Sequence, residues 1–183
     1  MFLLGVVSLS PPTNPIDVST IPVATLGPVS APRWLDEDET RAWRGLLHMH
    51  QVLRAELERE LIRDAGLSIA DYEVLVRLSQ AEGRRLRMSA LADVLQWSRS
   101  RLSHQVARMQ ERDLLRREEC PTDARGAFAT LTPTGLAAIE GAAPGHLAGV
   151  RRHLLDRLTS EQVRALAEIS EAVLRPDPDA SPW

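Results

Sequence analysis

Two neighbouring segments carry the side chains best suited to binding chemistry: a short polar helix and a basic turn. The helix is predicted over 98–109, SRSRLSHQVARM, with Ser98 placed to cap its first turn. The turn, TDARGA at 122–127, joins strand-like runs at 114–120 and 127–132 and predicts a β-hairpin. A polar helix and a projecting arginine suit two grooves of one duplex. The spacing therefore predicts a two-pronged surface for double-stranded DNA.

The distribution of charge supports this prediction. The chain has 183 residues and a formal net charge of −3. Between Arg84 and Gly126 there are ten arginines and six acidic residues, a net charge of +4, whereas the rest of the chain has a net charge of −7. Such a positive segment attracts phosphate even when the whole protein is acidic.

The residues of the polar helix have distinct expected roles. Arg99 and Arg101 lie in its first turn, where side chains and backbone amides can meet phosphates or base edges. His104 and Gln105 can hydrogen-bond bases. A face that is only solvated would normally include acidic residues, and this helix has none before Glu111. The predicted DNA-contacting residues of the helix are Ser98, Arg99, Ser100, Arg101, Ser103, His104, Gln105 and Arg108.

The elements that must position these residues begin with a long helix over 36–64. Asp36 and Glu39 have capping-box spacing at its start, and Gly66 supplies a stop. Ser68 is expected to cap the second helix. The apolar stripe of the first helix consists of Trp43, Leu46, His50, Leu53, Leu57 and Leu61.

The polar helix is expected to follow a strand and a third helix. The strand is predicted over 84–88, and Ser89 is expected to cap the third helix. In the polar helix, Leu102, Val106 and Met109 form a narrow apolar stripe that predicts its buried face.

Two helices follow the hairpin. Thr132 and Pro133 have the order of a cap and a first helical residue, and the apolar face continues to 158. We expect a kink near Pro144. Thr159 and Gln162 form a second capping box before a last helix over 160–174.

The fold class that follows is mainly α (α+β), because a helix-turn-helix followed by a β-hairpin is a winged helix-turn-helix. The termini are expected to lie outside it. Residues 1–33 contain six of the twelve prolines and predict a disordered extension, and residues 176–183 predict a tail. The N-terminus lacks the positively charged start of a signal sequence, and Cys120 is the only cysteine, so we expect a cytoplasmic protein without an internal disulfide or a membrane span.

Four stretches in this order resemble the MarR (multiple antibiotic resistance regulator) family of winged-helix transcription factors. They are Ser89–Leu95, Ser98–Asp113, Asp123–Gly126 and Leu131–Gly135. With their flanking helices they cover residues 35–174.

The resemblance implies a MarR-type domain over 34–175 with a winged helix-turn-helix at 67–132. The helices at 36–64 and 133–174 would form a dimerisation domain, so that a homodimer binds a near-palindromic DNA operator. Residues 98–108 would then be the recognition helix.

In the wing, the resemblance implies that Arg125 enters the minor groove and that Asp123 helps to orient it. The alternative is that Asp123 and Arg125 only pair with each other and stiffen the turn, which contributes about 0–1 kcal/mol at a surface.

The resemblance also implies a transcriptional regulator, a repressor, that a small aromatic or amphipathic effector releases from DNA. Trp43, His50 and Tyr72 are candidates to line an effector cavity, although large residues on apolar stripes usually pack in the core. Some family members sense oxidants through cysteine, but Cys120 is expected to be inert because nearby acidic residues raise a thiol pKa.

Other classes of protein fit less well. A winged-helix module that binds protein partners and no DNA would be expected to neutralise the basic segment, which this chain does not do. An enzyme is not expected because the sequence shows no nucleophile elbow, phosphate-binding glycine loop or paired carboxylates. No cofactor is predicted. No metal is predicted either, since His48 and His50 point to different helix faces.

Overall fold

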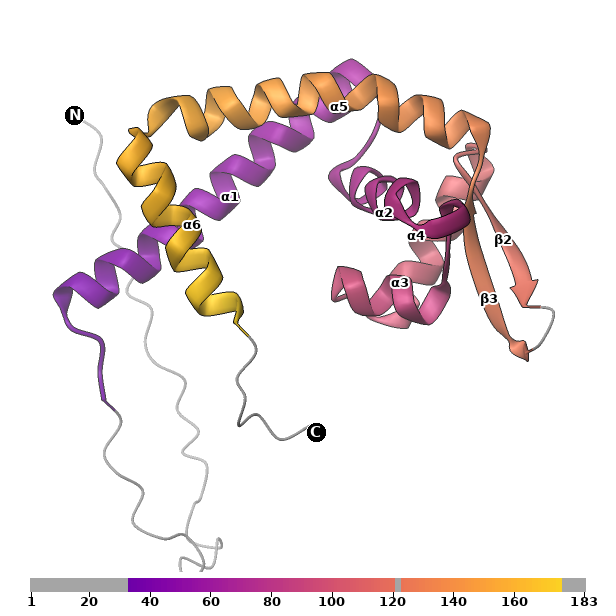
Figure 1. Cartoon of the computed structure of the whole chain (residues 1–183), viewed down its shortest axis with the longest axis horizontal. Coiled ribbons are helices and arrows are strands. Elements are labelled where there is room, and N and C mark those ends of the chain that lie inside the picture. Colours follow the sequence, from indigo (N-terminus) through magenta and orange to yellow (C-terminus); the bar gives the residue numbers. More distant parts are fainter. Residues whose placement is uncertain (1–32, 121–122, 176–183) are drawn as a thin grey trace, which may run out of the picture. The chain divides into compact units, whose positions relative to one another are not determined.

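The structure is a computed structural model that describes residues 33–120 and 123–175, with only the backbone of Cys120 and of residues 123–125. It is mainly helical with one small antiparallel sheet, which confirms the predicted winged helix (Figure 1). The helices are α1 (Glu37–Ala65), α2 (Ile69–Gln80), α3 (Met88–Leu95), α4 (Arg99–Glu111), α5 (Pro133–His153) and α6 (Ser160–Leu174), with short 3₁₀ turns η3 (Glu82–Arg84) and η4 (Leu155–Arg157). The strands are β1 (Arg85–Arg87), β2 (Leu115–Cys120) and β3 (Asp123–Leu131).

The capping box predicted at Asp36 and Glu39 is confirmed. The Glu39 amide donates to Asp36 Oδ1 at 2.8 Å, and the Asp36 amide donates to Glu39 Oε2 at 3.0 Å. Each residue thus satisfies a backbone amide of the other, which lets α1 begin at Glu37.

Later helix ends also follow the predicted caps. Gly66 has φ +63°, the left-handed conformation that ends a helix without strain in glycine. The hydroxyls of Ser68, Thr132 and Thr159 accept from backbone amides in the first turns of α2, α5 and α6.

Three predicted boundaries are wrong. Ser89 does not cap α3, because that helix already begins at Met88, with Arg87 in the cap position. The hairpin strand begins at Asp123 rather than 127, since cross-strand pairing continues toward the turn. The helix predicted to 158 ends at His153 and gives way to η4.

Pro144 lies inside α5 without breaking it. Every residue of Pro133–His153 is helical, and Figure 1 shows α5 as one continuous ribbon. The expected kink does not interrupt the helix; proline leaves one backbone carbonyl without its usual partner while packing maintains the helix on both sides.

The sheet has the order β1-β3-β2, and all pairs are antiparallel. Its inner face packs against helices: Ala129 is fully buried, and its cross-strand neighbours are Leu86 and Arg117. The main core lies between this sheet and α2, α3 and α4. Its largest fully buried side chains are Leu67, Val74, Leu75, Leu78, Leu91, Leu102, Val106, Met109 and Leu115.

The C-terminal half of α1 packs closely against α5. A Cβ at Gly149 would lie 3.0 Å from Leu57 Cδ2 and 2.5 Å from Glu60 Oε2, so only glycine fits without displacement. Glu60 also binds Arg152 at 2.7 Å and His153 at 2.8 Å across the same contact. The hydrogen bonds from His153 and then Arg152 lower the Glu60 pKa from 4.5 to about 2.

Candidate nucleic-acid interface

Helix α4, the predicted recognition helix, is held from inside by its apolar stripe. Leu102, Val106 and Met109 are buried as predicted, and the Ser98 hydroxyl accepts from the Arg101 amide at 3.2 Å. The preceding turn places Gln96 in the left-handed conformation, and the Trp97 amide returns to the Ala92 carbonyl at 2.9 Å. These contacts fix which face of α4 points outward.

The outward face carries serine and histidine side chains at its centre and arginines at its edges. Ser100, Ser103 and His104 are exposed, and no acidic residue lies in the first turn. Short polar side chains can approach base edges closely. The structure thus brings most of the predicted helix residues onto one accessible surface; DNA contact by each of them stays a prediction.

The arginines of the first turn lie on opposite flanks of this surface. Arg99 lines a groove beside the wing, whereas the Arg101 guanidinium stacks over the Trp97 ring at 4.1 Å from its centroid. Both are exposed. Arg101 therefore lies on the side of α4 that faces away from that groove.

Gln105 requires a correction. It was predicted to hydrogen-bond bases, but its side chain is buried, and its amide donates to Asp71 Oδ1 at 2.6 Å. Its carbonyl oxygen accepts from the exposed Arg108. Because both ends of the amide are used inside the protein, we assign Gln105 to positioning α4 rather than to reading DNA.

Asp71 is the centre of a network that sequence reasoning missed. Besides Gln105, its carboxylate accepts from Ser68 and from Arg112 at 2.8 Å, and Arg112 also donates to the Gly66 carbonyl at 2.7 Å. The network joins the α1–α2 turn to both the middle and the end of α4. The only local signal was the capping-box spacing of Ser68 and Asp71.

The wing residues Asp123 and Arg125 have side chains outside the described residues, so their roles remain predictions. At the base of the wing, Arg85 and Arg87 lie near the Phe128 ring, at 5.1 and 5.3 Å from its centroid. The sequence predicted this strand over 84–88 but did not single out Arg85 or Arg87 as site residues.

A cavity of about 870 Å³ lies between the α1 and α5 helices and the winged helix. His50 and Tyr72 line it as the resemblance suggested, together with His146, Trp97 and Arg101. The Tyr72 and His146 rings lie 4.2 Å apart, and burial raises the pKa of Tyr72 and lowers that of His146.

Trp43 does not belong to this cavity or to the core. Its side chain is exposed, as are Leu46 and His50 on the same predicted stripe, and only Leu57 and Leu61 near the end of that stripe are buried. The expectation of core packing for Trp43 is therefore wrong for the single chain.

The described residues contain no group of three or more His, Cys, Asp or Glu that could hold a metal ion. None of the helices that the structure describes is long and apolar enough to cross a bilayer.

Comparison with known proteins gives the same fold. AbsC, a MarR family transcriptional regulator from Streptomyces coelicolor, is 45% identical; the match covers 78% of this chain and 95% of AbsC, with a TM-score of 0.72. Sco3205, a MarR family regulator from the same organism solved in complex with DNA, is 43% identical over 82% of this chain and 97% of its own, with a TM-score of 0.75.

A variant of MarR from E. coli, solved with operator DNA, shares the fold at 22% identity, with 78% of this chain and 99% of that chain covered and a TM-score of 0.68. No curated protein sequence matches. The MarR family model matches residues 65–126, which run from the end of α1 to the wing. With this match and two relatives above 40% identity over nearly their whole length, the chain belongs to the MarR family of DNA-binding transcriptional regulators.

Proposed function

We propose that the protein is a homodimeric repressor that binds a near-palindromic operator and releases it when a small amphipathic ligand fills the 870 Å³ cavity. The observation that carries the proposal is an uncovered apolar surface on α6 and on the first half of α1. We infer regulation of transcription rather than catalysis, and with DNA as the partner we place the protein in the cytoplasm.

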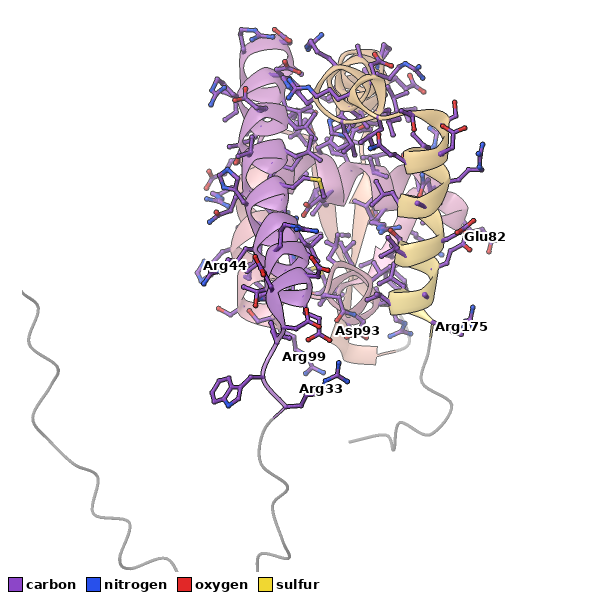
Figure 2. All side chains as sticks on the ribbon, turned by 90° about the vertical axis from the view of Figure 1, so that its left-hand side faces the viewer. Arg33, Arg44, Glu82, Asp93, Arg99 and Arg175 are labelled. Carbon is purple, nitrogen blue, oxygen red and sulfur yellow. The ribbon has the colours of Figure 1, made fainter. Side chains whose placement is uncertain are left out.

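Helix α6 is amphipathic and well capped, yet none of its residues is buried. Ile169 is 61% exposed, Val173 77% and Leu174 79%. In Figure 2 the α6 ribbon stands apart from the α1 ribbon. A short helix gains most of its stability from packing its apolar face, which indicates a partner for α6.

The first half of α1 offers a matching surface. Its exposed large apolar side chains are Trp43, Leu46, Leu47, Met49 and Val52. Together with α6 this exceeds the scattered exposure that monomers normally tolerate. A second copy of the chain supplies the same two surfaces, and two-fold symmetry is the commonest way for identical chains to cover them.

A dimer also explains how a modest positive patch holds DNA. One winged helix neutralises few phosphates, and affinity depends steeply on their number. Two recognition helices in successive major grooves, about 34–36 Å apart, would contact two half-sites related by the same two-fold axis.

The cavity supports a ligand response because its walls come from both parts of the molecule. Leu53 and Leu57 of α1 and His146 of α5 face Tyr72 of α2 and Trp97 beside α4. An occupant would contact the dimerisation helices and the start of the recognition helix together. The ligand's affinity can then differ between two arrangements of the dimerisation helices and the recognition helix. Such a difference in affinity is what allows a ligand to shift the population of the two arrangements.

The lining also indicates the ligand class. Apolar side chains alternate with Arg54, Arg77 and Arg101, and the one acidic lining residue, Glu73, is paired with Arg54 at 3.0 Å. Aromatic walls with available guanidinium groups suit a small amphipathic or aromatic molecule with a negative charge.

Selection of bound fragments from a random DNA pool, followed by a screen of small aromatic and amphipathic compounds for release, tests the proposal. We expect an inverted repeat and at least one compound that weakens operator binding. Enrichment of a single half-site without symmetry would contradict the dimer, and a cavity-filling compound that leaves operator affinity unchanged would contradict the ligand response.

A further inference from the structure

A second, smaller groove lies between the recognition helix and the wing. It has a volume of about 260 Å³ and is lined by Arg99 and Ser103 of α4, Ser89 of α3, Arg117 of β2 and the Gly126–Ala127 segment of β3. Pockets for small molecules usually have about 300–1,000 Å³. This groove is therefore better matched to one charged group than to a whole effector.

The lining of the groove is cationic. No acidic residue whose side chain the structure describes lines it. Within residues 33–119 and 126–175, whose side chains are described, neither Arg99 nor Arg117 forms an ion pair with a carboxylate. Guanidinium groups keep their charge at any physiological pH and match phosphate oxygens in geometry. Three arginines line the groove, and Arg87 is already engaged within the protein. The groove thus offers Arg99, Arg117 and two serine hydroxyls to an anion.

Sheet geometry explains why Arg117 faces the groove and its neighbour does not. Arg117 is opposite Ala129, which is fully buried on the inner face of the sheet. Arg116 is opposite Thr130 on the outer face, where it lies 3.7 Å from Glu118. Successive strand residues point to opposite faces, so the two arginines have the same charge but different surroundings.

The position of the groove specifies which anion reaches it. If α4 enters the major groove and the wing enters the adjacent minor groove, the DNA strand that separates these grooves must pass between the two prongs. The groove is lined by residues of both prongs, from α4 and from β2 and β3. A backbone phosphate is therefore brought to Arg99 and Arg117 by the docking geometry itself.

We propose that this groove binds a phosphodiester of the DNA backbone through Arg99 and Arg117, with Ser103 and Ser89 as additional hydroxyl donors. Arg99 then acts as a phosphate anchor and Arg117, which the sequence did not predict as a site residue, joins the interface. The inference rests on DNA binding by α4 and the wing, and not on dimerisation or on a ligand.

Salt dependence of DNA binding by the full-length protein tests the groove. We expect Arg117→Ala to weaken binding to the selected operator and to an unrelated duplex by the same factor. It should also lower the slope of log affinity against log salt by about 0.9 for each phosphate that the variant no longer neutralises. Arg116→Ala is the matched control and should change neither quantity. Arg117→Lys should recover most of the slope, because the charge remains.

Methylphosphonate scanning locates the phosphate and requires no variant to fold. Neutralising one backbone phosphate at a time should reveal, in each half-site, a phosphate between the two contacted grooves whose neutralisation weakens wild-type binding. The same substitution should have little further effect on Arg117→Ala, because the two changes remove one interaction.

Three results would overturn the assignment. The first is Arg117→Ala with wild-type affinity and slope, and the second is a loss that depends on base sequence, which would make Arg117 a base-reading residue. The third is competition by inorganic phosphate at constant ionic strength that Arg117→Ala abolishes, which would make the groove a free-anion site. A wild-type protein that binds no duplex would instead contradict the DNA-binding assignment as a whole.

Discussion

The same types of apolar residue are buried in the winged-helix core and exposed on the helices α1 and α6. Leu75, Leu78 and Leu102 are completely or almost completely buried within one chain. Ile169 and Val173 of α6 are also spaced so that they share one face of a helix, but they remain exposed. The comparison shows that periodicity identifies an apolar face without identifying what covers it. In the winged helix the cover is the same chain, and for α6 we propose a second chain.

The largest effect on stability should come from a substitution in the winged-helix core. Leu102→Ala removes a buried side chain beneath the recognition helix and should lower the free energy of unfolding by about 2–5 kcal/mol. Urea denaturation at several protein concentrations checks this. For Leu174→Ala at the exposed end of α6, the effect on stability should instead change with concentration. If the loss of stability depended on protein concentration for Leu102→Ala but not for Leu174→Ala, the proposed difference between the two regions would be contradicted.

The Asp71 network should come next. Asp71→Ala leaves Gln105 and Arg112 without their acceptor, at a cost of about 1–3 kcal/mol in unfolding free energy. Amide hydrogen exchange should quicken in α4 more than in α6. The exposed Asp93 on α3 provides a control, since Asp93→Ala should stay within about 0.5 kcal/mol of the parent. Equal exchange in both helices would show that the network does not position α4.

Adjacent residues of α4 allow reading and positioning to be separated. His104→Ala should relax preference at one or two base positions in each half-site, by about 1–3 kcal/mol, without changing stability. Gln105→Ala should reduce stability and weaken all sequences alike, because its side chain is buried on Asp71. Affinity measured over single-base operator variants distinguishes them. An equal loss on every sequence for His104→Ala would make it a phosphate anchor and leave sequence choice to DNA shape.

The effect confined to the narrowest range of conditions should be a pH dependence at the α1–α5 contact. Glu60 has a folded-state pKa of about 2 against an ordinary 4.5, so its contribution to stability is present above 4.5 and is lost as pH falls toward 2. Glu60→Gln should flatten the unfolding free energy across that window. Parallel curves for the two proteins between pH 4.5 and 2 would rule out this contribution.

The sequence predicted the local features well because their causes are local. The buried stripe of Leu102, Val106 and Met109 and the caps at Ser98 and Thr132 depend on residues within one or two turns. The features that it missed depend on distant partners. Gln105 is buried because Asp71, 34 positions earlier, meets its amide.

Strand pairing and assembly account for the remaining differences. Ser89 cannot act as a cap because α3 starts one residue earlier, directly where β1 ends at Arg87. Trp43 lies on a helix stripe whose spacing predicts core packing, but none of the described residues buries it. Arg117 escaped prediction because its inward position follows from its register with Ala129, which the hairpin sequence alone does not specify.

Sedimentation equilibrium of the full-length protein and of Ile169→Asp tests the homodimer most directly. We expect the parent to sediment as a dimer at micromolar concentration. The variant should be a folded monomer with strongly reduced operator affinity, because a carboxylate would be placed in the apolar surface of α6. A parent protein that is a stable, soluble monomer and still protects a single half-site from cleavage would contradict the account.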